Sequence, residues 1–206
     1  LLTAALCLSA AAQETSFTKT DYKTEMRDGV QLAMTVYTPA GNGRWPVVLM
    51  RTPYNKAAAE ARAKRYVVAG YAFAIQDCRG RYESEGEYVP FEDDMNDGYD
   101  TVEWLAKQSF SNGAIGMTGD SAPGITSNLA AAANPPHLKA AFVGVAPESL
   151  FYESRFIGGV FKESHAGGWM RGQGVAHQIP GMKKRVVMDD QWRATDLIHH
   201  RQNIHI

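Results

Sequence analysis

The sequence has little cysteine, no excess of basic charge and no long apolar run. Its 206 residues include only two cysteines, Cys7 and Cys78, and carry a formal net charge of -1. Such a charge balance does not indicate nucleic-acid binding. No apolar stretch reaches the roughly 18 residues that span a bilayer, so we expect no membrane-spanning helix. What remains is an ordinary globular composition, 45% hydrophobic and 21% charged, in a chain long enough for one sizeable core.

The first twelve residues are uncharged and almost wholly apolar or small, and they end in three alanines before Gln13. This pattern predicts the apolar region and cleavage site of a secretory signal peptide, and hence a secreted or periplasmic protein. A buried N-terminal helix is the alternative. Since no Met or basic segment precedes Leu1, we expect the sequence to begin inside the signal. Without residues 1–12 only Cys78 remains, and it cannot form an internal disulfide.

Short apolar runs alternate with helical patterns between residues 22 and 146. This alternation predicts an α/β fold: a mostly parallel sheet with helices on both sides, joined in part by a polar loop over 79–92. Strands are expected twice within 22–38, around the turn at 27–29, and at 46–50, 71–76, 114–118 and 139–146. Helices are expected at 57–69, 93–107 and 122–133.

The pattern changes after Pro147. Residues 150–206 contain aromatics, glycines and scattered charges but no strand-like run. We therefore predict that 13–149 form the N-terminal part of an α/β domain and that 150–206 begin a helical cap domain. The last residues carry no signal that ends a fold, so we expect the natural chain to continue beyond Ile206.

Ser121 lies where a predicted strand passes into a predicted helix, within Gly116–Gly124. A serine at such a junction occupies a strained turn that exposes its hydroxyl, and glycines on either side let the strand and helix approach. The spacing is G-x-S-x-x-G, with the second glycine, Gly124, one residue later than in the common G-x-S-x-G pattern. The local sequence leaves two interpretations open: a nucleophile, or a serine that N-caps a helix of small residues.

Four segments in order resemble the CocE/NonD family of serine hydrolases. This group includes cocaine esterases, X-prolyl dipeptidyl aminopeptidases and α-amino acid ester hydrolases. The likeness covers roughly residues 25–150 and implies the α/β-hydrolase fold. The segments are Met26-Arg27-Asp28-Gly29-Val30-Gln31-Leu32, Arg51-Thr52-Pro53-Tyr54-Asn55-Lys56, Asp77-Cys78-Arg79-Gly80 leading to Ser84-Glu85-Gly86, and Gly116 to Gly124.

The resemblance implies a role for three positions. Ser121 matches the nucleophile, Tyr54 matches a tyrosine whose hydroxyl helps to form the oxyanion hole, and the backbone N–H of Ala122 matches the second donor. Family members usually carry Tyr where this chain has Ala122, which changes the shape of the pocket. Pro123 follows and is expected to push Ala122 away from helical angles.

The resemblance places the Asp and His of the catalytic triad later in the chain, beyond residue 206. We therefore assign no triad role to the histidines of the cap segment, and expect residues 1–206 alone to be inactive or nearly so, because an unassisted serine hydroxyl is a poor nucleophile. These histidines are His165, His177, His199, His200 and His205.

The function implied is hydrolysis of esters or amides through a covalent acyl-enzyme, as in an acyl esterase or an X-Pro dipeptidyl-peptidase. The substrates expected are small esters, amides or short peptides, with no cofactor, metal, nucleic acid or membrane partner. One alternative is an α-amino acid ester hydrolase or β-lactam acylase. Our alignment argues against it, because Gly158 and Gly159 fall where those enzymes carry a carboxylate that holds the substrate's amino group. The other alternative is a catalytically inactive binding module.

Other charged clusters do not suggest chemistry. Residues 83–100 hold eight carboxylates, but Met95 breaks the spacing of a calcium-binding loop, so we predict a solvated acidic loop and helix start. We also predict an ion-pair network of Asp77, Arg79 and Glu85 beside the active site. The histidines at 199, 200 and 205 match no standard metal-site spacing.

Overall fold

We describe the chain from a computed structural model. The residues that it describes are 16–147, 149, 153, 155–158, 160–162, 164, 165 and 169. The predicted signal segment, residues 1–12, lies outside this set, as does most of the predicted cap segment. Within the described residues, no helix has the length and apolar character needed to cross a membrane.

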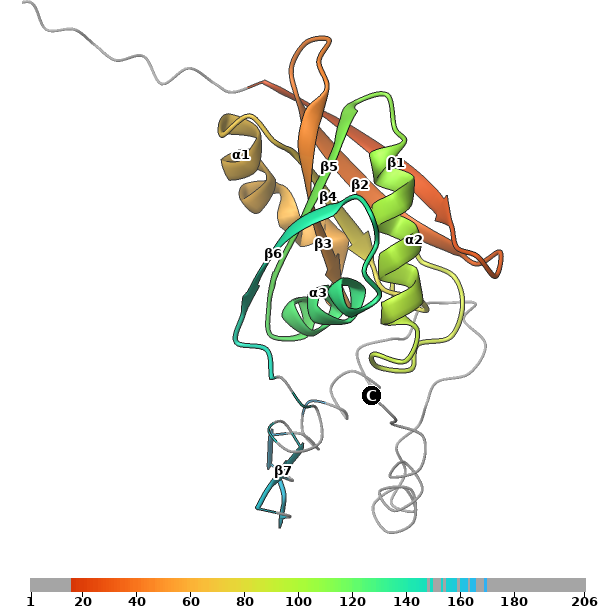
Figure 1. Ribbon diagram of the computed structural model, residues 1–206, viewed down its shortest axis with the longest axis vertical. Helices are drawn as coiled ribbons and strands as arrows, with labels where there is room; N and C mark the ends of the chain where they lie inside the picture. Colours follow the sequence, from red (N-terminus) through yellow and green to blue (C-terminus); the bar gives the residue numbers. More distant parts are fainter. Residues whose placement is uncertain are drawn as a thin grey trace, which may run out of the picture.

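A six-stranded sheet forms the centre of the fold (Figure 1). Two neighbouring pairs at one end, β1 with β2 and β2 with β4, are antiparallel, whereas β4, β3, β5 and β6 are mutually parallel. The predicted mostly parallel α/β sheet is therefore confirmed. In spatial order the strands are β1 (Phe17–Glu25), β2 (Gln31–Pro39), β4 (Ala72–Asp77), β3 (Trp45–Thr52), β5 (Ser111–Asp120) and β6 (Leu138–Gly144).

The helices follow the predicted segments. A turn of 3-10 helix, η1 (Lys56–Ala59), leads into α1 (Glu60–Val68), and the other two are α2 (Asp94–Ala106) and α3 (Ala122–Ala132). The chain leaves α1 through Gly70, whose φ of 83° lies in the left-handed region that glycine adopts without strain.

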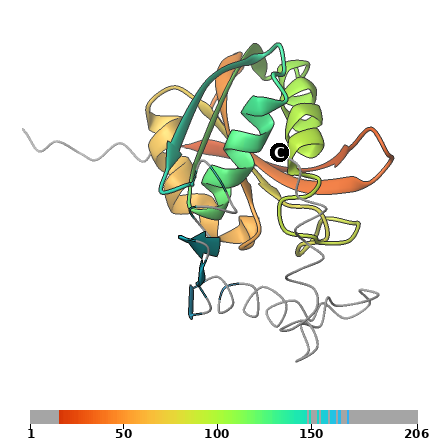
Figure 2. The same ribbon diagram turned by 60° about the horizontal axis from the view of Figure 1, so that its bottom comes forward.

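The helices cover both faces of the sheet, as Figures 1 and 2 show. Successive residues of a strand point to opposite faces, so β3 serves both layers. Val47 and Leu49 pack in one buried cluster with Val102 of α2. Met50 packs in another with Ala63 of α1. The long apolar runs of β3 and β4 follow from this burial on both sides.

A short hairpin lies beyond the sheet. It pairs β7 (Phe156–Ile157) with β8 (Val160–Phe161) in antiparallel register. The expectation that no strand follows Pro147 is therefore wrong. The physical signal is in the sequence, since two apolar pairs flank Gly158-Gly159, and a two-residue glycine turn of this kind favours a hairpin.

Arg51 lies near the end of β3 and is fully buried, with 0% of its surface exposed. Its Nη1 donates to Oδ1 of Asp94 at 2.7 Å, and its Nε donates to Oε1 of Gln76 at 2.8 Å. Nη2 lies 3.4 Å from Oδ2 of Asp97. Burial alone would lower the pKa of Arg51, but the Asp94 and Asp97 carboxylates outweigh it and raise that pKa. The guanidinium thus ties β3 to β4 and to the first turns of α2.

A second arginine, Arg79, comes from the loop after β4. Its Nη2 lies 2.6 Å from Oδ1 of Asp97, and its Nη1 lies 2.7 Å from Oδ2 of Asp28. The predicted network of Asp77, Arg79 and Glu85 is therefore wrong. The prediction of a solvated acidic helix start is also wrong for Asp94 and Asp97. These residues are only 5% and 1% exposed, and both pair with arginines.

We expect Arg51→Met to lower the free energy of unfolding by about 3–5 kcal/mol, because it leaves buried carboxylates without their counter-ion. Denaturant unfolding of the full-length protein measures this loss. The matched control is Arg27→Met: Arg27 pairs with Asp100 at 2.8 Å, but its side chain is 49% exposed. Removing a solvated pair should cost less than about 1 kcal/mol. Equal losses in the two variants would contradict the role given to Arg51.

Candidate active site

Three parallel strands end together at one edge of the sheet. In the register of β3 with β4, Thr52 is opposite Asp77, and in that of β3 with β5, Leu49 is opposite Met117. The segments that leave the carboxyl ends of β3 and β5 therefore emerge side by side, and they carry Tyr54 and Ser121. This edge is where open α/β sheets bind ligands.

Ser121 joins β5 to α3 in a backbone conformation that is rare for a residue with a side chain, with φ 60° and ψ −128°. Its N–H donates to the carbonyl of Gly144 at 3.0 Å, and its carbonyl accepts from the N–H of Gly124 at 2.9 Å and of Ile125 at 3.0 Å. The residue is exposed. Such a conformation costs about 1–3 kcal/mol and persists only where the surrounding contacts enforce it. The predicted strained turn is thus present at the predicted residue.

Close backbone contacts explain why the motif has glycine at positions 119 and 124. A Cβ on Gly119 would lie 2.3 Å from the carbonyl carbon of Pro123, closer than side chains approach. A Cβ on Gly124 would lie 2.9 Å from the carbonyl oxygen of Gly119 and 3.0 Å from that of Gly144. Gly124 therefore packs against the ends of β5 and β6, where a larger side chain would not fit.

Helix α3 begins directly after the serine. Ala122 is its first residue and Pro123 lies in the first turn, so the expectation that Pro123 keeps Ala122 out of helical angles is wrong. The first N–H groups of a helix have no acceptor within the helix, so proline is tolerated there. For the same reason the N–H of Ala122 has no partner within α3.

Tyr54 lies in the loop between β3 and η1. Its N–H donates to Oγ1 of Thr52 at 3.0 Å, and the residue is 40% exposed. The next residue, Asn55, has a φ of 87° and caps η1 by accepting from the N–H of Ala57 at 2.9 Å. The hydroxyl oxygen of Tyr54 accepts a hydrogen bond from Nε1 of Trp169 at 2.8 Å.

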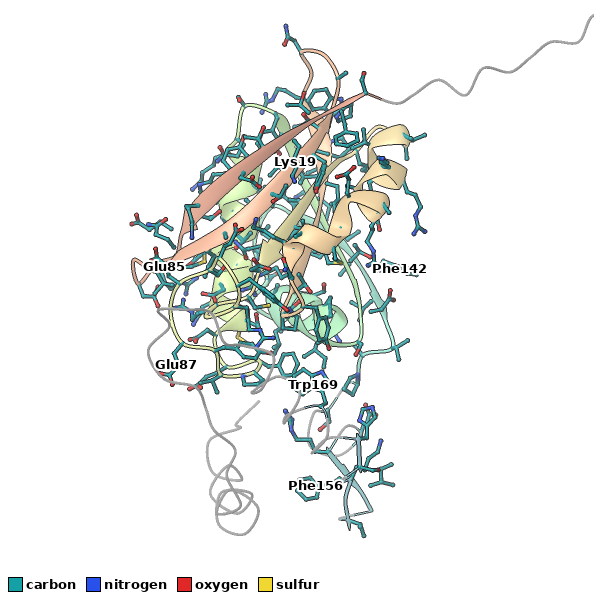
Figure 3. All side chains as sticks on the ribbon, turned by 180° about the vertical axis from the view of Figure 1, so that it is seen from behind. Lys19, Glu85, Glu87, Phe142, Phe156 and Trp169 are labelled. Atoms are coloured by element: carbon teal, nitrogen blue, oxygen red, sulfur yellow. The ribbon has the colours of Figure 1, made fainter. Side chains whose placement is uncertain are left out.

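Trp169 connects the two predicted parts of the site. Its ring stacks on Phe91, with centroids 5.7 Å apart and planes inclined by 8°. It also packs on the apolar cluster that contains Phe91 and Ala122. The tryptophan that binds the Tyr54 hydroxyl therefore also packs beside the residue next to Ser121. In Figure 3, Trp169 lies at the lower edge of the sheet, between the sheet and the hairpin that carries Phe156.

Trp169 could not be recognised as a site residue from the sequence. It stands 115 positions after Tyr54, in a stretch whose glycines and aromatics form no motif. Phe91 was also missed, and its φ of 70° is unusual for an aromatic residue. Neither residue has a local signal that sets it apart from an ordinary apolar residue.

The histidines within the described residues do not complete a triad. Nδ1 of His137 pairs with Oε2 of Glu103 at 2.8 Å. His137 directly precedes β6, whose first residue, Leu138, is opposite Ile115, so it lies at the edge away from Ser121. His165 is exposed, and the other four histidines lie outside the described residues. Within the part of the chain that is described, no group of three His, Cys, Asp or Glu side chains could hold a metal ion.

Comparison with known proteins gives the family. The profile of the X-Pro dipeptidyl-peptidase (S15 family) matches residues 28–203. Cocaine esterase from Rhodococcus sp. is 41% identical over 132 residues, which cover 61% of this chain and 23% of the esterase. A putative serine esterase from Mycobacterium bovis is 28% identical over 171 residues, covering 71% of this chain and 27% of that protein. The chain thus spans about a quarter of the length of these curated relatives.

Solved structures agree. A CocE/NonD family hydrolase from Staphylococcus aureus superposes with a TM-score of 0.75 at 26% identity, over 91% of this chain and 36% of that one. An α-amino acid ester hydrolase gives a TM-score of 0.59 at 34% identity, over 64% and 26%. The predicted α/β-hydrolase fold and the CocE/NonD resemblance are confirmed. With its profile matched over most of its length, the chain belongs to the X-Pro dipeptidyl-peptidase (S15) family.

Proposed function

We propose that the protein is a serine hydrolase that cleaves ester or amide bonds through an acyl-enzyme formed on Ser121. One observation carries this proposal: Ser121 occupies a strained, exposed turn at the carboxyl edge of the sheet. The Tyr54 hydroxyl, held by Trp169, belongs to the loop that leaves the neighbouring strand. A helix N-cap needs no such strain, and the Ser121 side chain makes no capping hydrogen bond to α3.

The chemistry follows from this geometry. The Oγ of Ser121 attacks the acyl carbon and gives its proton to a base, and the alcohol or amine then leaves with a proton. Water hydrolyses the resulting ester and restores the serine. We propose that the base is a histidine beyond residue 206, oriented by an aspartate, in the chain order of α/β hydrolases.

Two donors are proposed for the negative oxygen that forms during each step. One is the N–H of Ala122, at the start of α3, where the helix dipole also favours negative charge. The other is the hydroxyl of Tyr54. Because Trp169 donates to the oxygen of that hydroxyl, the proton of Tyr54 must point elsewhere, and a hydroxyl that accepts a hydrogen bond is a stronger donor.

The apolar residues near Ser121 and the relatives support a proposal for the substrate class. Phe91, Trp169 and Ala122 belong to one apolar cluster, in which Ala122 is next to Ser121, and this favours an uncharged acyl group. A small-molecule acyl ester is therefore the first candidate, in line with the cocaine esterase and serine esterase relatives. X-Pro dipeptidyl-peptidase activity is the second, on the strength of the family profile.

An α-amino acid ester hydrolase is a weaker candidate. Its support is the 34% identity to a solved enzyme of that name. Gly158 lies in the turn of the β7–β8 hairpin, and Gly159 lies outside the described residues, so the predicted lack of a carboxylate there still argues against it. Secretion or periplasmic location, and a cap domain that begins near residue 150, remain predictions from the sequence.

Wild-type full-length protein should release p-nitrophenol from p-nitrophenyl acetate in a burst of about one equivalent per chain, followed by slower turnover. Ser121→Ala should abolish both phases, because it removes the atom that forms the acyl ester. Stopped-flow absorbance measures the burst. A burst that survives in Ser121→Ala would mean that another residue is acylated.

Tyr54→Phe removes one oxyanion donor and keeps the ring. We expect kcat for the same ester to fall by about 10²–10³ with little change in KM, since the donor acts on charge that develops only in the transition state. Steady-state kinetics measure kcat and KM separately. A change in KM alone would place Tyr54 in substrate binding instead.

Trp169→Phe keeps an aromatic ring to stack on Phe91 and removes the N–H that Tyr54 accepts. A neutral hydrogen bond contributes about 0.5–1.5 kcal/mol, so kcat should fall about two- to tenfold. The matched test is the same substitution in Tyr54→Phe protein, where no hydroxyl remains and the loss should disappear. An equal loss in both backgrounds would show that Trp169 acts only through packing.

A further inference from the structure

The segment Asp77–Arg81 resembles the family motif but takes no part in the chemistry proposed above. We propose that Asp77 and Arg81 are positioning residues that hold the Tyr54 loop in place for the oxyanion. This inference rests on the proposed function of Tyr54. It comes from contacts that the two side chains make with the backbone on either side of Tyr54.

Asp77 holds the loop after Tyr54. Its Oδ1 accepts a hydrogen bond from the N–H of Lys56 at 2.7 Å, and the residue is 0% exposed. Its Oδ2 is buried without a hydrogen-bond partner. Burial raises the pKa of Asp77 to about 6. Backbone N–H groups of Lys56 and Glu83 offset part of this shift, and the Lys56 N–H places one contact of the carboxylate in the loop that carries Tyr54.

Arg81 holds the loop before Tyr54. Its Nε donates to the carbonyl of Pro53 at 2.9 Å, and the residue is 1% exposed. Its guanidinium lies over the ring of Tyr88, 4.5 Å from the centroid. Burial lowers the pKa of Arg81. The planar group is therefore fixed by its surroundings and directs one donor at the peptide that precedes Tyr54.

The segment Asp77–Arg81 is itself held in place by close contacts. The hydroxyl of Ser84 donates to the carbonyl of Asp77 at 2.7 Å, and the N–H of Cys78 donates to the carbonyl of Thr52 at 3.0 Å. A Cβ on Gly80 would lie 2.3 Å from the N atom of Tyr88, so only glycine lets the segment fold back this closely. The side chains of Asp77 and Arg81 are thus presented to the loop from a fixed backbone.

The Tyr54 loop needs such anchors. Asn55 is held at a φ of 87°, a conformation that non-glycine residues keep only where their neighbours enforce it. The peptides anchored by Arg81 and Asp77 flank Tyr54 and Asn55 on both sides. The contacts described here join each anchor to the backbone of this loop and not to the Tyr54 ring or hydroxyl, so the role proposed for both is to fix where the hydroxyl lies.

A double-mutant cycle tests this role in the full-length protein. We expect Asp77→Asn and Arg81→Met each to lower kcat for p-nitrophenyl acetate by about ten- to hundredfold, with KM changed less than about twofold, because a misplaced catalytic group loses rate rather than substrate affinity. In a Tyr54→Phe background the same changes should cost less than about twofold, since the hydroxyl that they position is absent.

Two outcomes overturn the proposal: an equal loss in both backgrounds, which marks a general structural role, and no loss in either variant. Glu85→Gln is the matched control from the same loop. Glu85 is exposed and accepts from the N–H of Gln31 at 3.4 Å, away from the Tyr54 loop. It should leave kcat unchanged.

A second readout does not depend on activity. Asp77→Asn replaces a charge-assisted acceptor by a weaker neutral one, so hydrogen exchange of the Lys56 amide should become about tenfold faster, while Glu85→Gln leaves it unchanged. An unchanged exchange rate in Asp77→Asn overturns the anchoring role even if the enzyme is active. Faster exchange in a protein that lacks hydrolase activity would instead retain the anchor and refute the proposed function.

Discussion

The rest of the structure depends on Arg51, whose buried guanidinium pairs with Asp94 and Asp97. Its side chain joins β4 through Gln76 and α2 through Asp94, and its carbonyl accepts from the hydroxyl of Thr126 in α3 at 3.2 Å. One residue near the end of β3 therefore contacts β4, α2 and α3. Such a charge is stable inside the protein only while its carboxylate partners are in place. The strands and helices that carry the site can therefore shift little relative to one another.

Two residues with strained backbone angles lie at the carboxyl edge of the sheet. Ser121 and Asn55 both have positive φ, and each follows the end of a parallel strand. The glycine contacts at 119 and 124 hold the first, and the anchors at Asp77 and Arg81 flank the second. These two strained turns lie side by side and carry Ser121 and the residue after Tyr54, which supports the proposal that a nucleophile and an oxyanion donor act together at this edge.

The parts of the fold that the sequence predicted are those with local signals. The runs of β3 and β4, and the junction at Ser121, are encoded by neighbouring residues, and the structure has them where expected. Contacts between distant residues could not be predicted in this way. Nothing near Arg79 shows that it pairs with Asp97 rather than Asp77, and nothing near Trp169 shows that it reaches Tyr54. The hairpin around Gly158 also has a local signal, since Gly158-Gly159 lies between two pairs of apolar residues.

The central claim is that Ser121 is an activated nucleophile in the complete protein. The most direct test is to react the full-length protein with a fluorophosphonate probe and to map the adduct by peptide mass spectrometry. The account predicts one adduct, on Ser121, that is absent from the Ser121→Ala variant. A folded full-length protein that takes no label, or takes it on another residue, would contradict it.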